Sequence, residues 1–259
     1  MSKFIAITGA SGGIGKSMAH VFASNGHNLI LAARRGDLLD ESAEKLRTDF
    51  GVDVRTFSVD LTEVEAVGMF YEAIRDLGLH ALINNAGLGD FSHVWEMNLD
   101  KASQIVALNM NAVTQLSLRF VADYCDDVAV LMNVSSIAGY TMYSGAVPYC
   151  ASKFYVSAFT EGVHLDLSSA GKPMSAKVLC PGPTASDFFS AGSIGSARRP
   201  FEDASPDTFL STEQLAVYAY ELFKSDHVVG IVDPATHRFE LSHPKFETSS
   251  STVPTNAVP

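Results

Sequence analysis

The sequence predicts an α/β fold, in which a doubly wound parallel sheet of about seven strands carries helices on both faces. Two observations predict it. Short apolar segments alternate with longer segments of helical character along nearly the whole chain, and this alternation is typical of parallel sheets covered by helices. The apolar segments are also almost continuously hydrophobic, as strands buried on both faces require.

The strands are expected in seven runs that are rich in branched and other apolar residues. These runs lie at residues 3–8, 28–33, 53–59, 80–85, 127–134, 175–180 and 228–232. The helices are expected between them, at residues 13–25, 37–50, 62–77, 99–124, 147–170 and 212–225. No linker interrupts the alternation, so residues 1–240 are expected to form one domain.

Two segments depart from this rhythm. Residues 183–210 contain glycine, serine and proline among scattered aromatic residues, and we expect them to form a long loop or lid. Residues 241–259 end in a run of serine, threonine and proline. Such a composition buries little apolar surface, so this C-terminal tail is expected to be flexible.

Composition and charge exclude several classes of protein. The 259 residues are 47% hydrophobic, and 18 basic against 29 acidic residues give a net charge of −11. This charge argues against nucleic acid or an anionic membrane as the main partner. Three widely spaced cysteines suggest no disulfide framework and fit a cytoplasmic protein. We expect no metal site, because the histidines lack ligand spacing, and no membrane span, because no apolar run reaches about 18 residues.

A glycine-rich turn follows the first strand and opens the first helix. Gly9, Gly13 and Gly15 have the spacing G-x-x-x-G-x-G. Glycine permits a tight turn and lets the backbone approach a pyrophosphate closely. The following helix then directs its first N–H groups and its positive dipole end at that anion. The turn therefore predicts a dinucleotide site.

The end of the second strand indicates which dinucleotide binds. NAD sites usually place an acidic residue here, to bind the ribose 2′-hydroxyl. In this sequence Ala33 occupies that position and is followed by Arg34 and Arg35. A guanidinium group can bind a 2′-phosphate through two hydrogen bonds, so we expect NADP(H). Arg34 is the first candidate for this phosphate contact. Arg35 is the second, because its side chain could point outward. Both arginines could instead be solvated residues at the start of the next helix.

Several short motifs occur in order along the chain. They are TGxxxGxG at residues 8–15, Asp60 in VDLT, NNAG at residues 84–87, Asn109 in LNMNA, Ser136 in NVSSIAG, YxxxK at Tyr149 and Lys153, and PG at Pro181 and Gly182. With these motifs, the sequence resembles the short-chain dehydrogenase/reductase family over about residues 3–232. Several independent motifs in the expected order are far more specific than any one of them. The resemblance implies a single Rossmann-type, NADP-binding catalytic domain.

The resemblance also implies the catalytic group Asn109, Ser136, Tyr149 and Lys153. Tyr149 and Lys153 are four residues apart, so they share one face of a helix. An ammonium group beside the phenol should lower the tyrosine pKa from about 10 and make Tyr149 a general acid/base. Ser136 would bind the substrate oxygen, and Asn109 would complete a proton relay to Lys153.

The cofactor contacts implied by the resemblance come from the turns that follow the strands. They are Gly9, Ser11, Gly13, Ile14, Gly15, Arg34, Arg35, Asp60, Leu61, Asn85, Ala86, Gly87, Tyr149, Lys153, Pro181, Gly182 and Thr184. The sequence leaves rivals for the catalytic group, namely Tyr140 and Tyr143, Ser135, and Asn111. An apolar substrate pocket could be lined by Phe91, Trp95, Tyr143, Phe188 and Phe189, although these residues could equally pack the core.

These expectations define an NADP(H)-dependent oxidoreductase that interconverts a carbonyl and an alcohol, with Tyr149 as general acid/base and a small-molecule substrate of unspecified class. One alternative is a catalytically silent NADP(H)-binding regulatory protein. Another is an epimerase or dehydratase on the same fold. The resemblance further implies a homodimer or homotetramer that pairs through the helices at residues 99–124 and 147–170.

Overall fold

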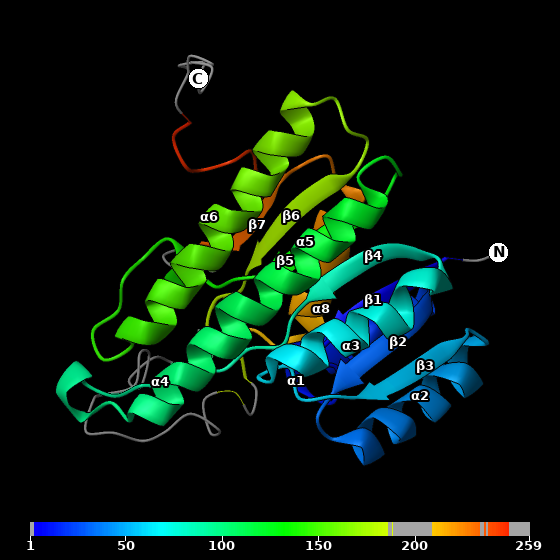
Figure 1. Ribbon diagram of the computed structural model, residues 1–259, viewed down its shortest axis with the longest axis horizontal. Helices are drawn as coiled ribbons and strands as arrows, with labels where there is room; N and C mark the ends of the chain where they lie inside the picture. The colour runs from blue at the N-terminus through cyan, green and yellow to red at the C-terminus, as the bar shows by residue number, and fades with distance from the viewer. Residues whose placement is uncertain (1–2, 186–187, 189–208, 234–235, 237, 249–259) are drawn as a thin grey trace, which may run out of the picture.

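The fold of the chain is built on one eight-stranded sheet (Figure 1). The computed structural model describes residues 3–185, 188, 209–233, 236 and 238–248. The strands are β1 (Phe4–Thr8), β2 (Asn28–Ala33), β3 (Val54–Ser58), β4 (Leu79–Asn84), β5 (Val130–Val134), β6 (Ser175–Cys180), β7 (Val229–Val232) and β8 (Phe239–Ser242). Their order in the sheet is β3-β2-β1-β4-β5-β6-β7-β8. The pairs from β3 to β7 are all parallel, so the predicted doubly wound sheet of seven parallel strands is confirmed.

The strand order creates a switch point between β1 and β4. The chain moves outward from β1 to β2 and β3, and then returns to pair β4 on the other side of β1. The loops that leave β1 and β4 therefore diverge at the carboxyl edge of the sheet. In open α/β sheets, ligands bind in the crevice that this divergence leaves.

Helices cover both faces of the sheet, as predicted. They are α1 (Gly13–Ser24), α2 (Gly36–Phe50), α3 (Val64–Ile74), α4 (Leu99–Val106), α5 (Val113–Tyr124), α6 (Val147–Ser169) and α8 (Thr212–Lys224), with short segments η1 (Arg75–Leu77), η2 (Val94–Glu96) and η4 (Ile137–Gly139). One apolar core joins α1, α2 and α8 to the sheet, and a second joins α3, α5 and α6 to the opposite face. Figure 1 shows α3, α5 and α6 on the near face.

Strand β1 shows how the sheet supplies both cores. Ile5 and Ile7 belong to the first core, whereas Phe4 and Ala6 belong to the second. Side chains alternate between the two faces of a strand. A strand that is covered on both faces must therefore be apolar at every position, which explains the continuous hydrophobic runs in the sequence.

Strand β8 extends the sheet beyond the seven predicted strands. It pairs antiparallel with β7, from Val229 opposite Ser242 to Val232 opposite Phe239. The sheet therefore continues two residues past the predicted domain end at residue 240. The backbone N–H groups of Lys245 and Phe246 then donate to Oε2 of the buried Glu161, at 2.7 and 2.9 Å. The first residues of the predicted tail are thus tied to the domain, and residues 249–259 lie outside the described residues.

The segment predicted as one helix over residues 99–124 consists of α4, a six-residue π-helical segment η3 (Ala107–Ala112), and α5. Among the described residues, this run is the one helical stretch that is long and apolar enough to cross a membrane by length and composition. It instead packs against its neighbours on the near face of the sheet, where 44% of its most apolar window is buried.

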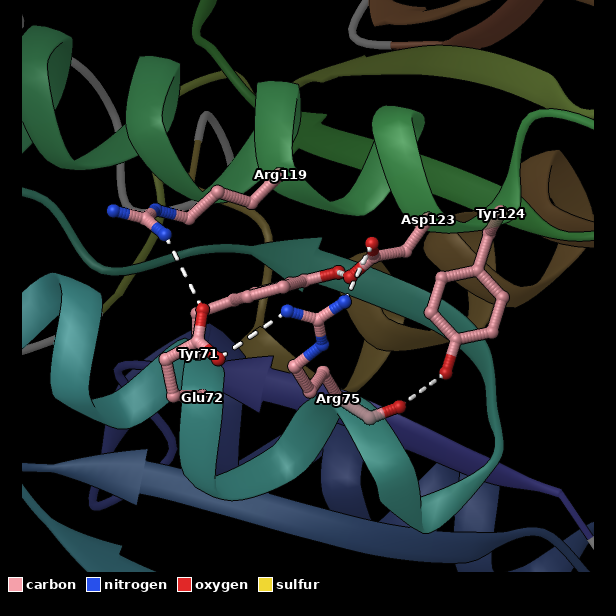
Figure 2. A network of polar contacts seen from close by, with 6 residues as sticks. All are labelled: Tyr71, Glu72, Arg75, Arg119, Asp123 and Tyr124. Carbon is pink, nitrogen blue, oxygen red and sulfur yellow. Dashed lines mark hydrogen bonds and ion pairs between the residues drawn. The ribbon is translucent and has the colours of Figure 1, made fainter.

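A polar network fixes α5 against α3 (Figure 2). The hydroxyl of the buried Tyr71 donates to Asp123 at 2.8 Å, and Arg75 forms an ion pair with the same carboxylate at 3.0 Å. The hydroxyl of Tyr124 reaches back to the carbonyl of Arg75 at 2.6 Å. Exposed ion pairs alone contribute little, but the buried tyrosine adds directional hydrogen bonding. The network sets the position of α5 and hence that of η3, which precedes it.

Candidate active site

A cavity of about 700 Å³ opens at the carboxyl edge of the sheet, at the switch point between β1 and β4. Its walls come from the loops after β1 to β6 and from the first turns of α6. Of the predicted site residues, all except Gly15 and Asn109 line this cavity. The structure therefore brings together motifs that are up to about 175 residues apart in the sequence.

The glycine turn has the close backbone approaches that a side chain would prevent. Gly9 has a φ of 69°, and a Cβ atom there would lie 2.8 Å from Cα of Ala86. Gly15 lies behind the turn, where a Cβ atom would be 2.4 Å from the carbonyl oxygen of Gly9. Gly9 therefore shapes the cavity wall directly, whereas Gly15 lets α1 pack against the turn.

Arg34 and Arg35 both line the cavity, with different partners. Nε of Arg35 donates to Oγ of Ser11 at 3.2 Å, and its guanidinium lies 2.8 Å from where a Cβ of Gly12 would be. Arg35 therefore lies along the glycine turn and does not point outward. Burial opposes the charge of Asp60, but hydrogen bonds from Thr62 and the nearby Arg34 hold the pKa of that carboxyl below its ordinary value.

The loop after β4 is hydrogen-bonded to the glycine turn. The backbone N–H groups of Asn85 and Ala86 both donate to Oγ1 of Thr8 at 3.0 Å. The side-chain amide of Asn85 donates to the carbonyl of Thr8 at 2.9 Å. Asn84, in contrast, is buried below the cavity and donates to Asn133 on β5. The two loops at the switch point thus form one hydrogen-bonded unit.

Tyr149 and Lys153 project from the first turns of α6 into the cavity. Lys153 is 5% exposed, and its Nζ donates to the carbonyl of Val134 at 2.9 Å. The ammonium lies 5.8 Å from the centroid of the Tyr149 ring. The predicted pair is therefore adjacent, but the lysine proton is bonded to the backbone at the end of β5.

Burial dominates the ionisation of this pair. Desolvation raises the pKa of Tyr149 to about 12, although a hydrogen bond with Ser136 opposes the shift. Desolvation also lowers the pKa of Lys153 to about 8. The expectation that Lys153 lowers the pKa of Tyr149 below 10 is therefore wrong. At neutral pH the phenol holds its proton and the lysine is still mostly charged.

The structure distinguishes the rival serines and tyrosines. Ser135 also lines the cavity, but its hydroxyl is engaged within the protein, where Oγ donates to the carbonyl of Lys153 at 2.9 Å. Ser136 caps η4 and also faces the cavity beside Tyr149. Tyr140 donates its hydroxyl proton to the buried carboxylate of Glu161, away from Tyr149. Tyr143 does line the cavity, where it packs against the cluster of Phe91, Ala138 and Ala146.

Asn109 lies on η3 and is 1% exposed. Its side-chain oxygen accepts from the backbone N–H of Leu88 at 2.8 Å. Its amide donates to the carbonyl of Leu88 at 2.8 Å and to Oγ of Ser152 at 2.9 Å. Asn109 thus clamps the loop after β4 to α6, while its rival Asn111 accepts from Gln115 on the same helical run. π-Helical turns are frequent at functional sites.

The remaining cavity wall follows β6. Pro181, Gly182 and Thr184 line it, and Oγ1 of the buried Thr184 donates to the carbonyl of Gly182 at 2.9 Å. The ends of the predicted lid are joined by a bridge between Thr184 and Leu210. The other lid residues 186–187 and 189–208, including Phe189, lie outside the described residues.

Of the candidate substrate contacts, Phe91, Tyr143 and Phe188 line the cavity, whereas Trp95 is 80% exposed and does not. Several further lining residues were not predicted as contacts, and they include Gly12, Val59, Leu108, Val134 and Ala146. All five lie within a few residues of a motif, and that proximity is the signal that could have found them.

A nicotinamide dinucleotide fits these residues. Helix α1 has no side-chain cap at its N-terminus, so its first N–H groups face the glycine turn without an intramolecular side-chain partner. An anion is the partner that such a helix terminus favours. Two guanidinium groups and the carboxylate of Asp60 border the same end of the cavity, and Tyr149 and Lys153 border the other. The helix terminus and the two guanidinium groups suit the phosphates of a dinucleotide that extends between these two ends.

Comparisons with known proteins agree with this geometry. The sequence model of the short chain dehydrogenase family matches residues 3–193. An uncharacterised oxidoreductase of Staphylococcus saprophyticus is 31% identical over 190 residues, which are 72% of this chain and 76% of that protein. Two further curated relatives are 30% and 34% identical, and the chain covers 18% and 64% of their lengths.

Two solved structures share the fold and hold nicotinamide cofactors. A short-chain dehydrogenase from Sphingobium yanoikuyae in complex with NADPH has a TM-score of 0.79 at 28% identity, covering 91% of this chain and 89% of that one. A short-chain dehydrogenase/reductase from Burkholderia phymatum in complex with NAD has a TM-score of 0.76 at 25% identity, covering 86% and 85%. The sequence, the sheet topology and these similarities together show that the chain belongs to the short-chain dehydrogenase/reductase family of oxidoreductases.

Proposed function

We propose that the protein is an NADP(H)-dependent oxidoreductase that interconverts a carbonyl and an alcohol, with Tyr149 as general acid/base. The observation that carries the proposal is one continuous cavity. At one end it has the glycine turn with two arginines, and at the other it has Ser136, Tyr149 and Lys153. The first end suits a phosphorylated dinucleotide, and the second suits proton transfer to a carbonyl oxygen.

Tyr149, Ser136 and Lys153 have different roles in the proposed reaction. The bound nicotinamide supplies the hydride. Tyr149 holds its proton at neutral pH, because burial raises its pKa to about 12, and it donates this proton to the substrate oxygen as negative charge develops there. Ser136 orients that oxygen by a second hydrogen bond. The charged Lys153 stabilises the phenolate that remains.

Asn109 and the two arginines have supporting roles in this proposal. Asn109 holds the loop at Leu88 against α6 through three hydrogen bonds and so keeps the cavity wall in place beside Lys153. Arg35, held along the glycine turn by Ser11, and Arg34, beside Asp60, form the pair that would bind a 2′-phosphate. This pair favours NADP(H) over NAD(H).

Exposed apolar residues on the long near-face helices support a homodimer or homotetramer. Val106, Leu118 and Leu165 are 50%, 52% and 43% exposed, and such residues are suited to burial between subunits. We also propose a cytoplasmic location, which fits the three free cysteines.

The experiment is a panel of carbonyl compounds assayed for NADPH and NADH oxidation. Arg34→Ala and Arg35→Ala should each raise the KM for NADPH about 10- to 100-fold, because each loses a charge-assisted contact. The KM for NADH should not change. Arg55→Ala, at the opposite end of β3, is the matched control. Equal effects on both cofactors would contradict the 2′-phosphate role, and cofactor binding without oxidation by any carbonyl would favour the silent regulatory alternative.

A further inference from the structure

The cavity has two chemically different halves. Its charged residues Arg34, Arg35 and Asp60 follow β2 and β3, and Lys153 lies at the junction. Beyond Tyr149 the wall consists of Gly89, Phe91, Ala138, Tyr143, Ala146 and Phe188. Among the residues that the structure describes, no charged side chain lines this second half.

Aromatic rings bracket the phenol in the uncharged half. The ring of Phe91 lies 6.0 Å from that of Tyr149, between centroids, with the planes tilted by 56°. The ring of Phe188 lies 5.6 Å away and is tilted by 53°. Tyr143 packs into the same cluster against Ala138 and Ala146. A group attached to a carbonyl at Tyr149 would therefore meet ring faces and edges.

Gly89 makes room for one of these rings. A Cβ atom at this position would lie 2.7 Å from Cζ and 2.8 Å from Cε1 of Phe188, and 3.6 Å from Cδ2 of Tyr149. The edge of the Phe188 ring thus occupies the space in which any other residue would carry its side chain. Because the obstructed atoms belong to a side chain, an alanine at residue 89 would displace the ring and leave the backbone in place.

We propose that the substrate is an uncharged carbonyl compound with an aromatic or other flat apolar ring next to the carbonyl, and that Gly89 and Phe188 together set the space for that ring. This inference rests on the function proposed above. The ring would pack among Phe91, Tyr143 and Phe188 while its carbonyl oxygen meets Tyr149 and Ser136. Flat rings gain from tilted and offset contacts with aromatic side chains, and a charged group would lose its hydration here without gaining a charged partner among the described lining residues.

The test compares two probes of nearly equal shape, 4-methylacetophenone and 4-acetylbenzoate, which differ in charge. Binding is measured by calorimetry on the Tyr149→Phe variant with NADPH, so that affinity is read without turnover, and kcat/KM is measured on the wild type. The neutral ketone should bind at least about tenfold more tightly than the carboxylate. Its kcat/KM should be higher by a similar factor.

Two substitutions test the role of the ring, in the same Tyr149→Phe background. Phe188→Ala should raise the Kd of the neutral ketone about fivefold or more, because one aromatic contact is lost, and should leave NADPH binding unchanged. Phe50→Ala, at the end of α2 and outside the cavity, is the control. Gly89→Ala should also weaken ketone binding, but not when Phe188→Ala is already present, since the obstructed ring is then absent.

Equal or tighter binding of the carboxylate would overturn the inference. So would insensitivity to Phe188→Ala, additive effects of the two substitutions, or no measurable binding of the neutral ketone. Selective binding of the neutral ketone without turnover by the wild type would uphold the binding preference and count against the proposed reaction. Turnover of aliphatic or anionic carbonyls in place of the aryl ketone would uphold the reaction and overturn the substrate class.

Discussion

Replacing Lys153 by methionine should stabilise the cofactor-free protein at neutral pH. The buried ammonium is the reason. Burial lowers the pKa of Lys153 from 10.5 to about 8, which corresponds to a penalty of about 3 kcal/mol for keeping the lysine charged. Methionine removes this penalty but leaves the carbonyl of Val134 without its donor, at a cost of about 1–2 kcal/mol. The net expectation at pH 7 is a gain of about 1–2 kcal/mol.

The pH dependence of this difference separates the electrostatic cause from a packing effect. Between about pH 8 and 10.5 the unfolded chain binds a proton at Lys153 that the folded chain does not, so wild-type stability rises with pH in this window. By pH 10 the penalty falls below about 1 kcal/mol, and the lost hydrogen bond makes the variant the less stable protein. Urea denaturation at pH 7 and pH 10 measures the free energy of unfolding of the wild type and of the variant. Lys16→Met, at an exposed position of α1, is the control, and a wild-type-to-variant difference that does not change with pH would refute the reasoning.

Three further predictions concern stability. Gly15→Ala should destabilise the protein by about 2 kcal/mol or more, because the new Cβ would lie 2.4 Å from the carbonyl oxygen of Gly9. Gly162→Ala, on α6 with no atom near its Cβ position, should stabilise it by about 0.5–1 kcal/mol, and thermal denaturation of the two variants compares them. Glu161→Ala should cost about 3–5 kcal/mol, because the Tyr140 hydroxyl and the N–H groups of Lys245 and Phe246 lose their acceptor. It should also speed proteolysis near residue 245, and a loss below about 1 kcal/mol would contradict this role of Glu161.

Buried parallel strands were the most predictable part of the fold. The predicted bounds 28–33 and 175–180 coincide with β2 and β6. Each strand is apolar at almost every position, because helices cover both of its faces. Strand β8 lacks this signal. It lies at the edge of the sheet, and its residues 239–242 are only partly buried or exposed, so its sequence needs no continuous apolar run.

The candidate site was predictable as a set of residues but not in its electrostatics. Motif spacing placed Ser136, Tyr149 and Lys153 in one cavity. The pKa of Tyr149 depends on how completely the fold removes water from the phenol, and spacing along a helix does not contain that information. The orientation of Arg35 along the glycine turn likewise results from a contact with Ser11, which is 24 residues away in the sequence.

Single-turnover kinetics of the Tyr149→Phe variant tests the central claim most directly. The enzyme and NADPH are mixed at saturation with whichever carbonyl compound the panel identifies, and NADPH fluorescence is followed. Loss of the general acid should reduce the rate constant about 10²–10⁴-fold even when NADPH is saturating. Tyr155→Phe, six residues further along α6, should react as the wild type does. A Tyr149→Phe rate close to that of the wild type would contradict the assignment of Tyr149 as the proton donor.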